Sequence, residues 1–178
     1  MAKKIFTPLT TDTIADLKVG DIVALSGKIL VARDAAHEKM VTSLKRNEEL
    51  SFSIKGETIF YAGPAPTPPG AVIGSIGPTS SYRMDPYTPF LLSSGVHGMI
   101  GKGIRSKEVV EAIKEHKAVY FGATGGASVL LSSFVISAET VAYEELGPEA
   151  VLRLEVKDMP LVVLIDSCGR NLYDKQNS

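Results

Sequence analysis

The chain has 178 residues, a length typical of one compact domain; 44% of them are hydrophobic and 22% are charged. This composition supplies enough apolar side chain for a core, which excludes disordered and fibrous classes. Lys and Arg number 19 against 20 Asp and Glu, so the formal net charge is −1. No overall positive field exists to bind a polyanion, and we expect no nucleic-acid partner.

Cysteine usage narrows the chemistry further. Cys168 is the single cysteine, so the chain cannot form an internal disulfide, build a four-thiolate zinc site or hold an iron–sulfur cluster. The start of the chain has two lysines but no apolar run behind them, and no stretch approaches the roughly 20 apolar residues of a membrane span. We therefore expect a soluble cytoplasmic protein with no membrane partner and no metal ligands of its own.

The first half of the chain alternates between helix and strand patterns. The hydroxyl-rich residues from Thr10 suit a helical turn that ends before Gly20, and Ser26-Gly27 predicts two extended pieces or a hairpin over residues 21–31. Asp34 is expected to cap an amphipathic helix ending near Asn47. The pattern then predicts a strand over 58–62, a proline-rich surface connection over 63–70 and an extended segment over 71–76.

The second half contains one strand–helix–strand unit. A helix around residues 90–92 precedes a strand over 96–100, a helix capped by Ser106 and a strand over 118–121, the pattern of a parallel crossover. The uncharged residues up to Ala138 suggest a helix buried in the core or against a partner. Further strands are expected at 141–143, 152–156 and 161–165, before a loosely held polar tail from about residue 167. The whole chain, residues 1–178, is predicted to be a single α/β domain.

Four polar or glycine-rich clusters follow predicted strands, at residues 33–37, 77–85, 101–103 and 122–128. In an α/β sheet such loops converge, and ligands bind where they meet. The cations that these clusters contribute are Arg33, Arg83 and Lys102, and Thr79, Ser80 and Ser81 add hydroxyls. This set suits a small dianion, such as a dicarboxylate or a phosphate.

Each cluster also has an ordinary structural interpretation. Arg33-Asp34 fits a helix cap with a surface ion pair, and residues 77–85 fit a turn and a helix start. Gly101-Lys102-Gly103 does not match the phosphate-loop pattern, and residues 122–128 lack the dinucleotide fingerprint. His97, His116 and Cys168 share no metal-ligand spacing, which favours structural or solvated roles.

The order of the clusters is more specific than any one of them. Five segments occur in sequence along the chain: Ala32-Arg33-Asp34-Ala35-Ala36-His37, Gly77-Pro78-Thr79-Ser80-Ser81-Tyr82-Arg83-Met84-Asp85, Gly101-Lys102-Gly103, Gly122-Ala123-Thr124-Gly125-Gly126-Ala127 and Glu145-Leu146-Gly147. Together they resemble the β subunit of class I, iron–sulfur fumarate hydratases, over nearly the whole chain. The departure is Ser80-Ser81-Tyr82, where many relatives have Thr and a smaller residue.

The resemblance implies a swivelling β/β/α domain that forms half of an active site. A [4Fe-4S] cluster would be held by a cysteine-bearing α subunit, in a heterodimer or an α2β2 assembly, and the substrate would be a small dicarboxylate. The resemblance implies substrate binding by Arg33, Arg83 and Lys102, and proton transfer or hydroxyl orientation by Thr79. Supporting positions by the same resemblance are Asp34, His37, Ser80 and Asp85.

These residue types suit hydration of fumarate to L-malate, because the reaction passes through an aci-carboxylate with extra negative charge that fixed cations stabilise. Two alternatives remain open. The β subunit of L(+)-tartrate dehydratase is similar in pattern, although Ala35-Ala36 between Asp34 and His37 resembles the fumarase form more. A non-catalytic module that binds small anions would carry the same basic loops.

Overall fold

The computed structural model describes residues 1–123 and 131–176. Its strands are β1 (Lys3–Phe6), β2 (Ile22–Val31), β3 (Thr58–Phe60), β4 (Gly98–Gly101), β5 (Val119–Ala123), β6 (Val135–Ala142) and β7 (Val151–Ile165). Its α-helices are α1 (Thr11–Asp16), α2 (Asp34–Lys45), α3 (Thr88–Ser93) and α4 (Lys107–His116). Three 3₁₀ segments are η1 (Ser81–Met84), η2 (Glu144–Glu149) and η3 (Leu172–Gln176).

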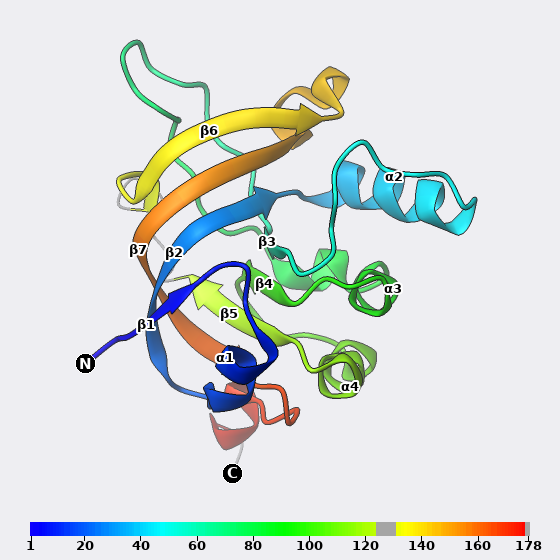
Figure 1. Ribbon diagram of the computed structural model, residues 1–178, viewed down its shortest axis with the longest axis vertical. Helices are drawn as coiled ribbons and strands as arrows, with labels where there is room; N and C mark the ends of the chain where they lie inside the picture. Colours follow the sequence, from blue (N-terminus) through cyan, green and yellow to red (C-terminus); the bar gives the residue numbers. More distant parts are fainter. Residues whose placement is uncertain (124–130, 177–178) are drawn as a thin grey trace.

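Five of the strands close into a mixed barrel. Strands β2, β3, β4 and β5 are neighbours and run parallel, and β7 pairs antiparallel with both β2 and β5. Strand β1 extends from β2 and strand β6 from β7 as outer strands. Figure 1 shows the long curved β2 and β7 on one side and helices α2, α3 and α4 on the other. The predicted single α/β domain is confirmed, but its sheet is closed rather than open.

Two long strands make the closure possible because each shares one edge between two partners. On β2, residues 23–26 pair with β1 and residues 30–31 pair with β3. On β7, residues 151–156 pair with β6 and residues 161–165 pair with β5. The opposite edges of β2 and β7 pair with each other, with a register shift between Leu25 and Gly27. Such irregularities increase local twist and bend strands into barrels.

Side chains alternate between two cores, as the two-residue period of a strand requires. Phe60 and Phe121 lie in the barrel interior, whereas their neighbours Tyr61 and Tyr120 lie in the core between the barrel and the helices. Helix α4 packs Val109 into this second core. Both cores therefore form from the same strands, and polar residues near strand ends can be held rigidly between them.

Helix starts largely follow the sequence signals. The Thr10 hydroxyl accepts a hydrogen bond from the Thr13 amide, and the Ser106 hydroxyl accepts one from the Val109 amide, so both helices begin as predicted. The β4–α4–β5 crossover is parallel, as expected. At α2, Asp34 is the first helical residue and Arg33 occupies the cap position without a side-chain cap bond. Asp34 is free for another partner.

Several sequence-based expectations are wrong. Residues 22–31 form one strand and not a hairpin, because β7 pairs along its length and the Gly27 region absorbs only a register shift. Residues 71–76 form no strand. Residues 135–138, predicted as the end of a buried helix, belong to the largely exposed strand β6, and the two predicted strands at 152–156 and 161–165 are one strand, β7. Of the rest of the predicted helix, residues 131–132 are helical, and residues 124–130 lie outside the described residues.

The start of the predicted polar tail, near residue 167, is held to the rest of the chain by hydrogen bonds. Asp166 is fully buried and accepts hydrogen bonds from the amides of Val19, Cys168 and Arg170. The chain then forms η3. Over the described ranges, 1–123 and 131–176, no helix combines the length and apolar character needed to cross a bilayer.

Candidate active site

The candidate site lies where the parallel barrel strands end. Because β2, β3, β4 and β5 run in the same direction, their carboxyl ends meet at one end of the barrel. Arg33 comes two residues after β2, Tyr61 directly follows β3, and Lys102 directly follows β4. Two of the predicted clusters, at residues 33–37 and 101–103, are thereby brought to one end of the barrel.

The segment that contains Thr79 lies between the ends of β3 and β4. The Thr79 amide donates to the Tyr61 carbonyl at 2.8 Å, and the Ser81 amide donates to the Lys102 carbonyl at 3.0 Å. Pro78 and Ser80 form isolated β-bridges with Ala62 and Lys102, respectively. The hydroxyl-bearing segment is therefore a backbone-paired part of the barrel end, with Thr79 and Ser80 half-buried.

Glycine is required where this segment meets β4. A Cβ atom built on Gly101 would lie 1.9 Å from the Ser81 hydroxyl oxygen. The same oxygen accepts a hydrogen bond from the Lys102 amide at 3.0 Å. Gly101 thus allows the close approach that fixes the backbone of Lys102, whose side chain is exposed to solvent.

The two predicted substrate-binding arginines meet at one carboxylate. Arg83 forms an ion pair through Nη2 with Asp34 Oδ2, and Arg33 Nε lies 3.9 Å from Asp34 Oδ1. Arg33 Nε also lies 3.4 Å from Glu149 Oε1. The side chains of Arg33 and Arg83 are 28% and 42% exposed, although Arg33 Nε itself is buried. This arrangement suits recognition of a small carboxylate.

Glu149 was not predicted as part of the site. It lies at the end of η2, and its carboxylate also accepts a hydrogen bond from the Ala35 amide at 3.3 Å, at the start of α2. A carboxylate there compensates the unpaired amides of the helix N-terminus. The nearby Glu145-Leu146-Gly147 motif was the only sequence signal for this segment.

His37 lies beneath the site. It is fully buried, and its Nδ1 donates to the Arg33 carbonyl at 2.9 Å, while Nε2 has no hydrogen-bond partner among the described residues. Its ring packs edge-on against Tyr61, with the centroids 5.3 Å apart. Burial lowers the pKa of His37 to about 4, so the ring is neutral near pH 7 and supports the Arg33 backbone.

Asp85 leads to a buried network that the sequence did not reveal. Asp85 Oδ1 pairs with Arg105 Nε at 2.6 Å, and Asp85 Oδ2 accepts a hydrogen bond from the Ser106 amide at 2.8 Å. The Arg105 side chain has no exposed surface. A single arginine before a helix cap gives no sequence signal for burial, because arginine is usually exposed.

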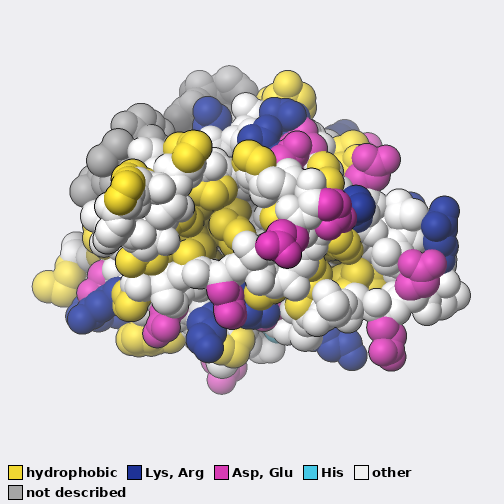
Figure 2. Space-filling view, turned by 90° about the horizontal axis from the view of Figure 1, so that it is seen from above, with side chains coloured by type: hydrophobic (Ala, Val, Ile, Leu, Met, Phe, Trp, Pro, Cys, Tyr) yellow, Lys and Arg dark blue, Asp and Glu magenta, His cyan; other side chains and the backbone are white. Residues whose placement is uncertain are grey.

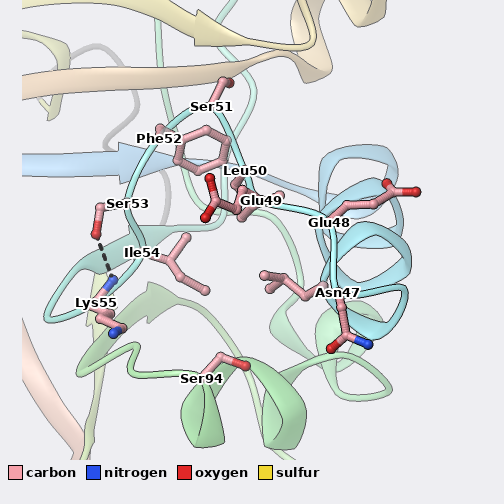
Figure 3. Close-up of a pocket in the computed structure, with 11 residues that line it drawn as sticks. Asn47, Glu48, Glu49, Leu50, Ser51, Phe52, Ser53, Ile54, Lys55 and Ser94 are labelled. Carbon is pink, nitrogen blue, oxygen red and sulfur yellow. Dashed lines mark hydrogen bonds between the residues drawn. The ribbon is translucent and has the colours of Figure 1, made fainter.

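A groove elsewhere shares none of the predicted residues. It has a volume of about 720 Å³ and lies between the end of α2, residues 47–55 and Ser94. Figure 3 shows its lining, in which the Ser53 hydroxyl accepts a hydrogen bond from the Lys55 amide. The groove contains no cluster of cations, so it does not suit a small dianion.

The described residues do not fit an iron–sulfur cluster. Among residues 1–123 and 131–176, no three His, Cys, Asp or Glu side chains are placed to hold a metal ion. Cys168 follows β7, whose end pairs with the start of β5, so it lies at the opposite end of the barrel from Arg33 and Lys102. A cluster that acts at this site would need ligands from outside these residues.

The fold and this end of the barrel define an α/β domain with arginines on loops near the ends of its parallel strands. The sequence matches the family described as "Fumarase C-terminus" over residues 3–176, and the chain belongs to that family.

The similar proteins fall into two groups by length. The chain is 41% identical to the aerobic class I fumarate hydratase of Salmonella typhimurium over 93% of this chain, and 40% identical to fumarate hydratase 2 of Leishmania major over 91%. In both cases it spans 29% of the relative's length. It is also 41% identical to a Methanocaldococcus jannaschii protein provisionally named L(+)-tartrate dehydratase subunit beta, over 97% of this chain and 91% of that protein.

Residues 124–128 of the predicted cluster at 122–128 lie outside the described residues. The roles of Thr79, Ser80, Arg33, Arg83 and Lys102 toward a substrate stay predictions.

Proposed function

We propose that this chain is the β subunit of a two-subunit iron–sulfur hydro-lyase that hydrates fumarate reversibly to L-malate. The observation that carries the proposal is the meeting of Arg33 and Arg83 at one carboxylate, at the barrel end where Lys102 also lies. Two guanidinium groups and an ammonium group would bind a dicarboxylate and stabilise the charge that develops on it. In this proposal Thr79 orients the reacting hydroxyl or transfers a proton.

The proposed partner is a cysteine-bearing α subunit that holds the [4Fe-4S] cluster. The chain spans 29–30% of three fumarate hydratases that it resembles, so most of the length of those proteins has no counterpart in it. Beside the candidate site, Tyr82 and Ile104 are each 63% exposed. Large apolar side chains so placed would be buried when a partner closes over the site, which suits a swivelling domain in a heterodimer or α2β2 assembly.

The charge distribution agrees with a small-molecule ligand. Figure 2 shows basic and acidic side chains interspersed over part of one face, beside a hollow in which apolar side chains gather. Nothing on this face forms a continuous basic stripe of the kind that binds a nucleic-acid backbone. A cytoplasmic location stays a prediction.

Tartrate dehydration is the second candidate, because the Methanocaldococcus jannaschii relative is matched along nearly its full length and is provisionally named a tartrate dehydratase subunit. Tartrate and malate are both hydroxy dicarboxylates, so the same arginine pair suits either.

The test is reconstitution. This chain and its cysteine-bearing partner are purified separately under anaerobic conditions, treated with iron and sulfide, and assayed alone and mixed, with fumarate and with L(+)-tartrate. We expect this chain alone to stay colourless and inactive, and the mixture to consume fumarate, followed by its ultraviolet absorbance. Activity on tartrate only would promote the second candidate. Full activity from this chain alone would refute the two-subunit proposal, and no activity in any mixture would favour an anion-binding module.

A further inference from the structure

The candidate site residues sit on two loops that depend on each other. Thr79 and Arg83 lie on residues 77–85, and Lys102 lies on the turn between β4 and α4. A substrate that contacts both loops is positioned well only if the loops are fixed relative to each other, because misplacement by about 1 Å can cost a hundredfold in rate.

Arg105 is at the centre of the contacts between the two loops. Its Nε is bonded to Asp85, two residues after Arg83, and its Nη2 donates to the Thr88 hydroxyl at 2.8 Å and lies 3.3 Å from the Tyr61 hydroxyl. The guanidinium carbon lies 5.2 Å from the ring centroid of Tyr61 and 4.8 Å from that of Tyr120. The planar fork of arginine can meet these partners at once, which an ammonium group cannot.

Tyr120 completes the connection on the other side of Arg83. Its hydroxyl lies 2.8 Å from both the Ser81 hydroxyl oxygen and the Gly103 carbonyl oxygen. Ser81 in turn is bonded to the backbone of Lys102. Burial raises the pKa of Tyr120, so its hydroxyl stays protonated. Arg83 therefore lies between two anchored residues. Ser81, two residues before Arg83, is hydrogen-bonded to Lys102. Asp85, two residues after Arg83, is bonded to Arg105 and to the Ser106 amide.

We propose that Arg105 is a positioning residue that fixes the loop carrying Thr79 and Arg83 against the turn carrying Lys102. This inference deepens the proposed function and, as far as it concerns catalysis, rests on it. Arg105 itself is buried and does not reach solvent, so it acts through Asp85, Tyr61 and Tyr120. A buried ion pair often contributes little to stability compared with apolar replacements of both partners, and can instead specify one arrangement.

The test separates positioning from simple stability. The double variant Arg105→Met with Asp85→Asn removes both charges together, so that no buried charge is left unpaired. Tyr120→Phe is the milder variant, because it removes one hydroxyl and keeps the ring. The matched control is Arg153→Met with Glu57→Gln, which removes a half-buried ion pair of 3.1 Å between β7 and the residue before β3. Within the described part of the chain, the Arg153 and Glu57 side chains pair with each other and form no hydrogen bond or ion pair with residues 77–85 or 101–103.

Amide hydrogen exchange of the full chain is the primary readout. We expect the amides of Ser81 and Lys102 to exchange at least tenfold faster in the double variant, and severalfold faster in Tyr120→Phe, while the paired amides of β2 and β7 keep their protection. The control pair should leave Ser81 and Lys102 unchanged. In the assembled enzyme, the double variant should raise KM at least tenfold with a smaller change in kcat, and the control should change neither.

Unchanged exchange at Ser81 and Lys102 in the double variant would overturn the inference. Faster exchange spread equally over β2 and β7 would overturn it too, because it would show a general loss of stability. The proposed function fails separately, if the wild-type assembly converts neither fumarate nor tartrate. The exchange experiment then still decides whether Arg105 fixes the two loops.

Discussion

Two aspartate–arginine pairs lie at opposite ends of the barrel and differ in what else each carboxylate binds. Asp166 has no exposed side-chain surface, and its oxygens accept hydrogen bonds from three backbone amides as well as from Arg170 Nε at 2.8 Å. Asp34 is 30% exposed, and its partners are the guanidinium groups of Arg33 and Arg83. The Asp166 carboxylate is buried, with its hydrogen bonds made inside the fold, whereas the Asp34 carboxylate is partly exposed to solvent.

The difference separates a structural pair from a candidate binding pair. Asp166 joins the segment before β2 to the chain after β7, so its bonds close the amino end of the barrel. At the other end, Arg83 pairs with Asp34 through Nη2, and its side chain is 42% exposed to solvent. A pair of the same residue types therefore predicts function only when the burial and the other partners of the carboxylate are known.

The largest effect should come from Asp166→Asn. The amide keeps the shape of the side chain but turns an NH₂ group toward backbone donors, so several charge-assisted bonds are lost in a buried site. We expect a loss of about 3 kcal/mol in the free energy of unfolding, measured by urea denaturation at pH 7. The matched variant Asp34→Asn should lose less than about 1 kcal/mol, because Asp34 and its partner Arg83 are partly exposed to solvent. Equal losses would remove the distinction between the two ends.

Arg83→Lys should affect activity rather than stability. An ammonium group cannot reproduce the planar two-point contact with a carboxylate. In the assembled enzyme we expect kcat/KM to fall tenfold or more, which corresponds to about 1.4 kcal/mol. Arg170→Lys is the control at the other end of the barrel, and it should lower the unfolding free energy while kcat/KM stays within twofold of wild type. Unchanged kcat/KM in Arg83→Lys would remove Arg83 from the site.

His37 predicts a pH dependence of stability that belongs to the site end. Its pKa in the folded chain is about 4, below the ordinary 6.5, because of burial. Between these values the unfolded chain binds more protons, so stability falls as the pH falls from 6.5 toward 4. From pH 7 to pH 5.5 we expect a loss of about 1 kcal/mol from this group.

The check is urea denaturation at both pH values for wild type and His37→Gln. The variant should lack this part of the pH dependence, whereas His116→Gln, which replaces a ring on α4 with 31% exposure, should retain it. A wild-type stability that does not change over this range would contradict the buried, neutral ring.

Local patterns predicted the elements whose signals are local. The caps at Thr10 and Ser106 and the β4–α4–β5 crossover follow from nearby hydroxyls, glycines and apolar spacing. The barrel closure could not be predicted in this way, because it depends on β2 and β7 pairing across 130 or so residues. The same reason explains why residues 22–31 suggested a hairpin: the partner that straightens them is far away in the sequence.

The site was predictable in part. Arg33 and Lys102 follow predicted strands, and Arg83 lies on a segment that begins with Gly77, so their placement near one end of the sheet could be inferred. The order of the motifs added the resemblance to a family. Arg105 and Glu149 had no such signal. Their partners come from other parts of the chain, and burial of a charged residue is decided by tertiary packing that single-sequence patterns do not encode.

The smallest predicted effect concerns the packing around Arg33. A Cβ atom built on Gly63 would lie 3.2 Å from Arg33 Cδ and 3.1 Å from the Pro148 carbonyl oxygen, closer than ordinary contact. Gly63→Ala should therefore displace the Arg33 side chain by a few tenths of an ångström while leaving its charge intact. We expect KM in the assembled enzyme to rise about threefold, equivalent to roughly 0.6 kcal/mol, with little change in kcat.

The urea midpoint at pH 7 provides the control, since a shift as large as that of Asp166→Asn would show that the fold, and not the position of Arg33, had changed. An unaltered KM would mean that Arg33 either tolerates this displacement or does not bind substrate. Arg33→Lys distinguishes these two explanations, because it keeps the charge but removes the planar guanidinium group. This variant lowers kcat/KM only if Arg33 contacts the substrate.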